Sequence, residues 1–343
     1  MTGRMSPHLS VVVPHPRGIA PSLALQSLAR NGGNLDIQVL AVEGRQPSWQ
    51  RNLAVQSARG KVVLFLDHDS EVLPGTLEAH LKAMRDPRVG VAGGPNVPSG
   101  REGWFGRMAG LVFGSPLGSP LVWRRYRGGA GTDNGNEKSL ILCNLSVRRA
   151  AFLECGGFDP RLYPNEENEM INRLQRRGWR AVYSPRMVVA KARPSRLVDY
   201  ARENARNGRG RLEQAWVNPH RGDAVFLVAL VGGTAGTSAA WVTGPLPWLA
   251  AYGALTAVEG LRLALSGPVV RRNHALATAA GCAALIALRH TAYFGGMVAG
   301  ALTGWRKRKL CFPPLRMLQR EYRIRGRRMV AVGRGTVRQG GHG

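Results

Sequence analysis

The chain has 343 residues, with 48 Lys and Arg against 21 Asp and Glu, which gives a formal net charge of +27. Its length accommodates one large domain or two ordinary ones, and an apolar content of 44% excludes an intrinsically disordered protein. The four cysteines show no short paired spacing, which argues against a disulfide framework and against a zinc knuckle. The opening sequence MTGRMSPHLS lacks the pattern of a signal peptide, so we expect the first folded part to stay in the cytosol.

The positive charge is unevenly distributed along the chain. Basic residues are dense over residues 173–221, recur at Arg271 and Arg272, and crowd residues 306–328. A charge of this size suits nucleic acid, an anionic membrane surface or phosphate-bearing substrates. Because nearly uncharged apolar stretches lie between these segments, the pattern favours a membrane protein with positively charged cytoplasmic flanks.

Short apolar runs alternate with segments of helical spacing through residues 9–92. We expect strands at residues 9–13, 37–42, 61–66 and 89–92, and helices at residues 21–30, 49–59 and 74–84. This alternation predicts an α/β fold with a mostly parallel, doubly wound sheet. Residues 93–135 are rich in Gly and Pro and are expected to form a long irregular connection. Beyond it we expect strands at residues 140–147 and 181–184 and helices at residues 150–155, 166–177 and 196–216.

Apolar helices are predicted after residue 223. Residues 224–242 and 246–258 are typical of a helical hairpin, because a helix that crosses a bilayer needs about 20 apolar residues. Residues 275–304 form a further apolar region, which Arg289 and His290 interrupt, so two half-depth or interfacial helices are favoured over one span. Gly296 and Gly300 in this region have the spacing for close helix packing.

Two aspartates, Asp67 and Asp69, directly follow the apolar run KVVLFL. Ligands of open parallel sheets bind at the carboxyl ends of the strands. Paired carboxylates at such a place suit a hard divalent cation that also holds a diphosphate. A solvated turn is the alternative interpretation, but the position at the end of a buried strand favours the metal site.

Three further carboxylates, Glu166, Glu167 and Glu169, open the predicted helix at residues 166–177. The helix dipole favours acidic residues there without any function. Glu169 lies four residues before Arg173, so we expect these two side chains to pair. Either Glu166 or Glu167 would then be available as a general base, and spacing alone leaves the structural and the catalytic interpretation open.

Basic residues are repeated over residues 202–211, just before the apolar region. A solvated basic face or a contact with lipid headgroups is the simpler interpretation. A corner at Asn207, Gly208 and Arg209 would instead aim guanidinium groups at a diphosphate, for which the arginine fork is well shaped.

Taken in order, these features resemble the family-2 glycosyltransferases, which have the GT-A fold and use nucleotide-activated sugars. The resemblance extends from Leu9 to about Trp216. It is carried by the segments LSVVVP, IQVLAVEG, RNLAVQSARGKVVLFLDHDSEVLP and CNLSVRRAAFLECGGFDPRLYPNEENEMINRLQRRGWRAVYSP. The order of NEENEMINR, a basic helix and apolar hairpins is most similar to membrane enzymes of the succinoglycan-glucosyltransferase type.

The resemblance implies inverting transfer of a hexosyl group from a nucleotide-diphosphate sugar to a lipid-linked or polysaccharide-precursor acceptor, such as a polyprenyl-diphosphate sugar. It implies a bacterial enzyme of the plasma (inner) membrane whose catalytic domain is cytoplasmic. A single addition is expected, because the Gln-x-x-Arg-Trp signature of processive polymerases is absent. The resemblance assigns Glu167, or alternatively Glu166, as the catalytic base, and Asp69 and Asp67 as ligands of Mg²⁺ or Mn²⁺. It assigns nucleotide and diphosphate binding to Pro14, Glu43, Arg51, Asp67, Arg209 and Arg211.

The resemblance also divides the chain into four segments. Residues 1–100 would be the nucleotide-sugar-binding half of the GT-A domain, and residues 101–220 the acceptor-side half with the basic helix. Residues 221–304 would be membrane helices, and residues 305–343 a basic cytoplasmic tail.

Two segments depart from the family pattern, so other functions are considered as alternatives. The segments HPRGIAPS and GRQPSWQ are short and lack the usual nucleoside-binding pattern, which favours a catalytically inactive, membrane-anchored partner of a polysaccharide assembly complex that binds a nucleotide sugar. A nucleic-acid-binding protein would interleave aromatic with basic residues, whereas residues 196–211 contain only Tyr200, so we expect no nucleic-acid partner. A nucleotidyltransferase would carry a Gly-rich phosphate loop after the first strand, where Pro14, His15 and Pro16 stand instead.

Overall fold

The computed structural model describes residues 7–128, 131–220, 224, 228, 231–232, 235, 244–266, 274–303 and 317–337. The chain divides into two compact units. The first, here called the sheet unit, consists of residues 1–99, 128–191 and 311–343, and the second, the helical unit, consists of residues 100–127 and 192–310. This grouping differs from the four consecutive segments expected from the sequence, because each unit is assembled from separate stretches of the chain.

A nine-stranded sheet is the centre of the sheet unit, with the order β12-β11-β2-β1-β3-β8-β5-β9-β7. Its strands are β1 (Leu9–His15), β2 (Asp36–Glu43), β3 (Val62–Leu66), β5 (Val89–Gly93), β7 (Asp133–Asn134), β8 (Asn144–Arg148), β9 (Arg180–Tyr183), β11 (Met317–Arg325) and β12 (Arg328–Val337). The α/β class predicted from the sequence is confirmed.

The sheet is mixed rather than mostly parallel. Strands β2, β1 and β3 are parallel neighbours, as are β5 and β9, whereas β8 is antiparallel to both β3 and β5. Strands β7, β11 and β12 are antiparallel to their neighbours as well. Parallel pairing needs a crossover, usually a helix on the sheet. Such helices precede β2, β3, β5 and β9, whereas the stretches before β8 and β11 include residues of the helical unit.

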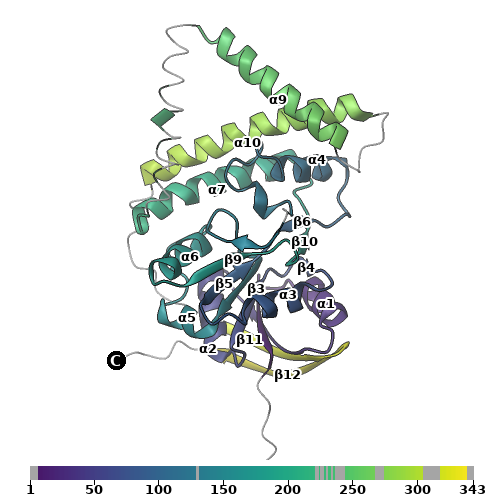
Figure 1. Cartoon of the computed structure of the whole chain (residues 1–343), viewed down its shortest axis with the longest axis vertical. Coiled ribbons are helices and arrows are strands. Elements are labelled where there is room, and N and C mark those ends of the chain that lie inside the picture. Colours follow the sequence, from purple (N-terminus) through teal and green to yellow (C-terminus); the bar gives the residue numbers. More distant parts are fainter. Residues whose placement is uncertain are drawn as a thin grey trace, which may run out of the picture. The chain divides into compact units, whose positions relative to one another are not determined.

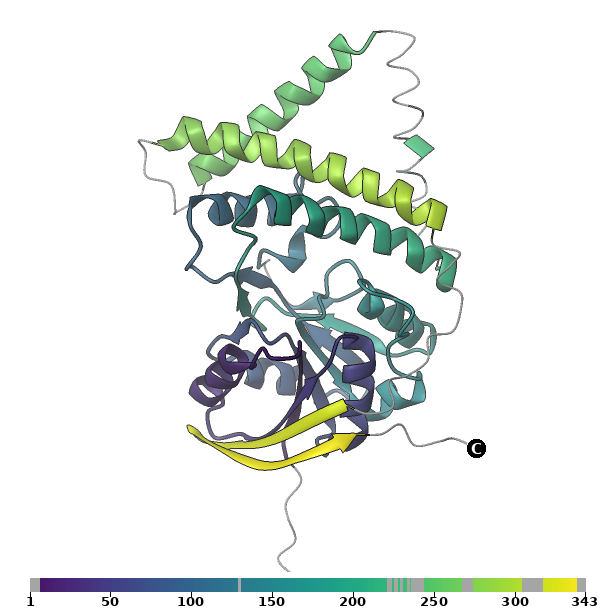
Figure 2. The ribbon, with the colours of Figure 1, turned by 180° about the vertical axis from the view of Figure 1, so that it is seen from behind.

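Helices of the sheet unit cover both faces of this sheet (Figures 1 and 2). They are α1 (Ser22–Asn31), α2 (Pro47–Ser57), α3 (Thr76–Ala83), α5 (Arg149–Glu154) and α6 (Glu166–Arg176). Strand residues alternate between two apolar clusters: Val12 packs with α2, α5 and α6, whereas Val11 and Val13 pack with α1 and α3. The continuous apolar runs of the sequence therefore mark strands that are buried on both faces.

Residues 317–337, expected to belong to a basic tail, form the hairpin of β11 and β12 at the edge of the sheet, seen in yellow in Figures 1 and 2. Strand β11 pairs along the whole of β2. Ile324 is fully buried beside Ile37, and Arg323 and Arg325 form ion pairs with Asp36, the first residue of β2. Apolar residues such as Met317 and Ile324 lie between the arginines of β11 and are buried, which explains why this segment joins the sheet.

A second, three-stranded sheet has the order β4-β10-β6. Its strands are β4 (Ser70–Val72), β10 (Val189–Lys191) and β6 (Asn96–Pro98). Lys191, the last residue of β10, lies opposite Ser70 of β4 and Pro98 of β6. This small sheet therefore brings Lys191 beside the residue that follows Asp69.

The helical unit contains α4 (Trp104–Phe113), the short 3-10 helix η1 (Trp123–Arg125), α7 (Leu197–Val217), α9 (Leu246–Ser266) and α10 (Ala275–Thr303). The irregular connection expected at residues 93–135 is wrong where α4 forms. Met108, Ala109, Val112 and Phe113 of α4 are buried at helical spacing against apolar residues of α7 and α10. Of the expected hairpin, residues 246–258 are helical within α9, and most of residues 224–242 lie outside the described part of the chain.

A single continuous helix, α10, replaces the two half-depth or interfacial helices expected at residues 275–304. The interruption at Arg289 and His290 is tolerated because both side chains have polar partners. The Arg289 guanidinium donates to Asn204 Oδ1, and His290 lies 2.8 Å from both the Tyr252 hydroxyl and the Leu117 carbonyl oxygen. Among the described helices, α10 is the one with the length and apolarity to cross a membrane, and 28% of its most apolar stretch of 18 residues is buried.

Glycines allow α7 and α10 to approach each other closely, as the GxxxG spacing predicted. A Cβ on Gly296 would lie 2.0 Å from the Ala205 carbonyl oxygen, and one on Gly300 would lie 2.4 Å from that of Arg209. Gly208 of α7 is equally close to the Tyr293 carbonyl oxygen. The corner expected at residues 207–209 is therefore wrong: α7 is continuous there, and Gly208 serves helix packing.

Candidate active site at the carboxyl ends of the parallel strands

The carboxyl ends of β2, β1 and β3 lie at one edge of the sheet because these strands are parallel neighbours. The register pairs His15, the last residue of β1, with Glu43, the last residue of β2, and Asp67 directly follows β3. The side-chain amide of Gln50 in α2 donates to the His15 and Val42 carbonyl oxygens and ties α2 to these strand ends. Pro14 is buried within β1 and Glu43 is partly exposed.

Arg51 of α2 joins the end of β3 to the start of α6. Its Nη2 lies 3.1 Å from Asp67 Oδ1, and its Nη1 lies 3.0 Å from Glu166 Oε1. The side chains of Arg51 and Glu166 are 5% and 2% exposed, so this is a buried ion pair. The resemblance to the family assigned these three residues to the site separately, and the structure shows that one guanidinium connects them.

Lys191 provides a second cation at the same point, and it is not among the site residues predicted from the sequence. Its Nζ lies 2.7 Å from Asp67 Oδ2 and 2.9 Å from Asp69 Oδ1. Both carboxylate oxygens of Asp67 are thus bound to cations, while the side chain of Asp69 is 49% exposed. No local pattern marks this lysine, because it is the last residue of a three-residue strand far from the Asp-x-Asp segment in the sequence.

These charges shift the pKa values in the site. Burial opposes ionisation of Asp67, but the charges of Lys191 and Arg51 outweigh it and hold the pKa of Asp67 well below its ordinary value. Burial also disfavours the charged form of Lys191, yet Asp67 and Asp69 hold the pKa of Lys191 above its ordinary value. For Glu166 burial prevails over the charge of Arg51, and the pKa of Glu166 is raised. The Asp67–Lys191 contact is therefore a pair of charged groups.

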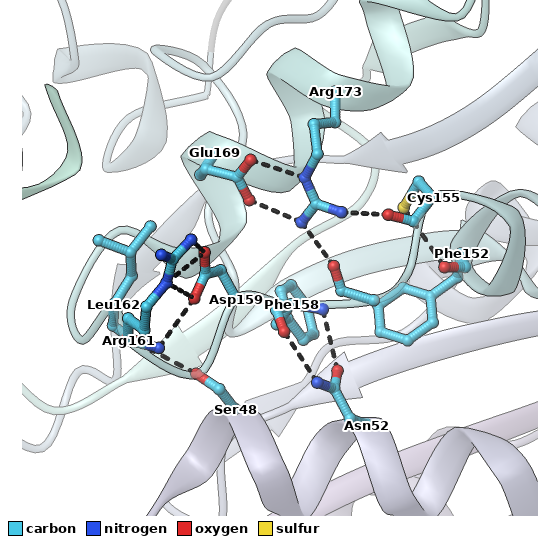
Figure 3. A network of polar contacts seen from close by, with 11 residues as sticks. Ser48, Asn52, Phe152, Cys155, Phe158, Asp159, Arg161, Leu162, Glu169 and Arg173 are labelled. Carbon is cyan, nitrogen blue, oxygen red and sulfur yellow. Dashed lines mark hydrogen bonds and ion pairs between the residues drawn. The ribbon is translucent and has the colours of Figure 1, made fainter. Parts of the chain in front are cut away.

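The loop before α6 is fixed by polar contacts to α2 (Figure 3). The Asn52 amide exchanges two hydrogen bonds with the backbone of Phe158, at 2.8 and 2.9 Å, and the Ser48 hydroxyl donates to the Leu162 carbonyl oxygen. Further along, Arg173 pairs with Glu169 through two contacts of 2.6 Å, as their spacing predicted. These contacts set the position from which α6 begins with Glu166 and Glu167, both buried.

Two predicted diphosphate ligands, Arg209 and Arg211, lie on α7 in the helical unit. Arg209 Nε is 3.5 Å from Glu213 Oε1, and the buried Arg211 donates to Gln214 Oε1 at 3.4 Å. Both arginines therefore have partners within their own helix, and their binding to a diphosphate stays a prediction.

The fold family implies a divalent cation, which would need oxygen ligands at the ends of the strands. Carboxylate oxygens such as those of Asp67 and Asp69 are ligands that Mg²⁺ and Mn²⁺ prefer. In the described part of the chain, no group of three or more His, Cys, Asp or Glu side chains is arranged so that it could hold a metal ion. The two aspartates therefore offer part of a ligand set for such a cation, and the Lys191 ammonium lies between them.

The chain is similar to one protein family and to solved structures. The family model described as "Glycosyl transferase family group 2" matches residues 62–294, more than half of the chain. The solved structure of S. aureus TarS is 14% identical with a TM-score of 0.41, and the match covers 90% of this chain and 58% of that one. The structure of GalNAc-T7 with UDP, GalNAc and Mn²⁺ is 14% identical with a TM-score of 0.37, covering 55% of this chain and 44% of that one.

The chain therefore spans about half the length of these solved structures. No curated protein sequence matches it. The family match extends from β3 through the Asp-x-Asp segment, α6 and α7 into α10. With its large mixed sheet typical of the GT-A fold, the chain belongs to glycosyl transferase family group 2.

Proposed function

We propose that the protein is a membrane-associated inverting glycosyltransferase that moves a sugar from a nucleotide-diphosphate sugar to a lipid-linked or polysaccharide-precursor acceptor, one sugar at a time. The observation that carries this proposal is the Arg51 bridge, which joins Asp67 at the end of β3 to Glu166 at the start of α6. The bridge links Asp67, next to the proposed binding site of the sugar donor, with Glu166, next to the proposed catalytic base for the acceptor. The chain that contains it belongs to a glycosyltransferase family.

On the donor side, Asp69 with help from Asp67 would hold Mg²⁺ or Mn²⁺. When bound, such a cation neutralises the charge that builds up on the leaving diphosphate. Arg51 keeps the Asp67 carboxylate oriented, because its Nη2 is fixed at 3.1 Å from Oδ1. Pro14 and Glu43, at the ends of β1 and β2, would contact the nucleoside.

On the acceptor side, Glu167 would take the proton from the acceptor hydroxyl as that oxygen attacks the anomeric carbon. The new C–O bond forms on the face opposite the diphosphate, whose bond to the same carbon breaks, so the configuration inverts. Glu166 is held by Arg51 and suits a positioning role better than that of the base, which supports Glu167. Arg209 and Arg211 would add positive charge toward the leaving diphosphate.

Apolar side chains of the helical unit support the membrane part of the proposal. On α9, Leu249 and Leu265 are 63% and 72% exposed, and on α10, Leu276 is 82% exposed. Exposed apolar faces on long helices suit a bilayer. The acceptor would then be a polyprenyl-diphosphate type lipid at the inner membrane of a bacterium, with the sheet unit in the cytoplasm.

Sugar transfer tests the proposal directly. Full-length protein in detergent would be incubated with radiolabelled nucleotide sugars, bacterial membrane lipids, and either Mg²⁺ or Mn²⁺. We expect one donor to give lipid-extractable label. Failure of every donor to label lipid or polysaccharide precursor, with a folded protein, would contradict a glycosyltransferase function.

Matched variants then test the assigned residues. Asp69→Ala and Glu167→Gln should each lower turnover by at least about 100-fold, since they remove a cation ligand and the base. Glu154→Gln, an exposed change at the end of α5, is the control and should retain activity. Undiminished turnover of Glu167→Gln together with an inactive Glu166→Gln would assign the base to Glu166.

An inactive, membrane-anchored nucleotide-sugar-binding partner remains the alternative, because the segments after β1 and β2 are short. It predicts binding of a nucleotide sugar without transfer and without slow hydrolysis. Measuring hydrolysis of the bound donor with and without Mn²⁺ separates the two functions.

A further inference from the structure

The ammonium of Lys191 occupies the space between the two aspartates of the Asp-x-Asp segment. It is 2.7 Å from Asp67 and 2.9 Å from Asp69, whereas Arg51 contacts only the first of these two aspartates. A divalent cation shared by Asp67 and Asp69 would need the same carboxylate oxygens. Because the ammonium and such a cation repel each other, the two cannot bind there together.

The backbone of Lys191 is fixed, while its side chain is long and flexible. Strand β10 pairs Lys191 with Ser70 on one side and with Pro98 on the other, so its Cα is held in the middle of the small sheet. The ammonium stands at the end of four rotatable bonds, and the side chain is 25% exposed. It can therefore leave the carboxylates without any change in the fold.

Lys191 is paired with both aspartates while it is in place. Its ammonium contacts Asp67 and Asp69, and Arg51 pairs with Asp67 and Glu166. A metal ion arriving alone must displace an ammonium that is already well paired. A metal ion arriving with a diphosphate brings negative charge with which the released ammonium can pair, so the exchange then costs less.

We propose that Lys191 is a built-in counter-cation of the Asp67–Asp69 pair, which keeps the divalent cation out of the donor-free protein. The cation then binds together with the donor diphosphate and displaces the ammonium. This inference rests on the proposed function for the nature of the diphosphate ligand, whereas the exchange of cations at the two aspartates does not depend on it.

Binding of Mn²⁺ alone to the full-length, donor-free protein in detergent tests the proposal, with free Mn²⁺ measured by its electron paramagnetic resonance signal. Lys191→Met removes the charge and should tighten Mn²⁺ binding by at least about tenfold. Lys191→Arg keeps a cation and should show no such gain. Lys82→Met, an exposed change on α3, alters the net charge equally and should bind Mn²⁺ as the unaltered protein does.

Two additional measurements make the result specific. Adding Asp69→Asn to Lys191→Met should abolish the gain, because the new binding would use that carboxylate. Thermal unfolding monitored by circular dichroism should show that each variant is folded, and the comparison of Lys191→Met with Lys191→Arg uses proteins altered at the same position.

Equal Mn²⁺ affinity of Lys191→Met and the unaltered protein would overturn the proposal, as would an equal gain for Lys191→Arg. Sugar transfer that is insensitive to chelators and is lost in Lys191→Met would also overturn it, since the ammonium would then be a permanent substitute for the metal. Tighter Mn²⁺ binding in Lys191→Met without any sugar transfer would leave this proposal intact and contradict the proposed function.

Discussion

Two buried arginines show how differently the two units of the molecule accommodate positive charge. Arg51 in the sheet unit is 4% exposed and contacts two carboxylates, Asp67 and Glu166. Arg289 in the helical unit is 5% exposed, donates to the neutral Asn204 amide, and lies 4.4 Å from the centroid of the Phe113 ring. One cation is balanced by opposite charge, and the other by a neutral acceptor and an aromatic face.

The two arrangements differ in what the loss of the arginine leaves behind. A buried guanidinium between carboxylates fixes their positions, and removing it leaves uncompensated charge behind. In the helical unit, glycine contacts hold α7 against α10, and the buried Arg289 and His290 have neutral partners. We therefore expect the sheet unit to depend on charge and pH, and the helical unit to depend on the size of side chains.

The largest expected effect compares the two arginines directly. Arg51→Met should lower the free energy of unfolding of the sheet unit by about 3–5 kcal/mol, because Asp67 and Glu166 lose a buried counter-charge. Arg289→Met should cost the helical unit only about 1–2 kcal/mol, because it leaves neutral groups behind. Denaturant unfolding followed by hydrogen exchange in peptides of each unit measures both values.

A double variant strengthens this comparison. Arg51→Met with Glu166→Gln should recover part of the lost stability, since one of the unpaired carboxylates becomes neutral. Equal costs for Arg51→Met and Arg289→Met, or no recovery in the double variant, would contradict the distinction between the two units.

A buried histidine of the sheet unit predicts a pH dependence. Burial lowers the pKa of His80 from 6.5 to about 4, although a hydrogen bond to Asn144 favours its protonated form. Below pH 6.5 the unfolded chain binds a proton that the native chain does not bind until about pH 4. The contribution of neutral His80 to the free energy of unfolding is therefore complete above pH 6.5, and it falls by about 3 kcal/mol as the pH is lowered to 4.

The difference in unfolding free energy between the unaltered protein and His80→Gln, measured from pH 4 to pH 8, isolates this contribution from the carboxylates that titrate nearby. The unaltered protein should lose more stability on acidification than the variant. Parallel pH profiles of the two proteins would show that His80 does not titrate in this way.

Adjacent glycines of α10 test the packing of the helical unit. A Cβ on Gly296 would meet the Ala205 carbonyl oxygen, whereas one on Gly295 would meet no atom within 4 Å among the described residues. Gly296→Ala should therefore cost about 1–3 kcal/mol by separating α10 from α7. Gly295→Ala should stabilise the helix by up to about 1 kcal/mol. Hydrogen exchange over residues 275–303 distinguishes the two, and equal protection would contradict the close approach.

The smallest effect concerns the edge of the sheet unit. A hydrogen bond from Arg323 holds the pKa of Asp36 at about 2 in spite of burial. This ion pair stabilises the protein above the ordinary pKa of aspartate, and its contribution disappears as the pH falls toward 2. Because the pair is near the surface, Asp36→Asn should cost only about 1 kcal/mol at pH 7. Faster hydrogen exchange confined to residues 317–337 is the expected sign.

Local sequence patterns determined which secondary-structure elements form and where several side chains of the candidate site lie along them. Alternating apolar strands and helices predicted the α/β class, and the position of Asp67 and Asp69 after an apolar run predicted carboxylates at the end of β3. The four-residue spacing of Glu169 and Arg173 predicted their ion pair, and the GxxxG spacing predicted the close approach of α10. Each of these inferences needed only residues close together in the chain.

Tertiary structure decided what depended on residues far apart in the chain. Lys191 reaches the aspartates because β10 pairs with β4, and no nearby residue indicates this contact. Likewise, β11 pairs with β2, although most of the chain separates them in the sequence. Helix α10 stays continuous because Asn204 on α7 accepts a hydrogen bond from Arg289. Hydrophobic periodicity and short spacing specify which elements form, whereas pairing between distant strands and helices specifies which charges meet.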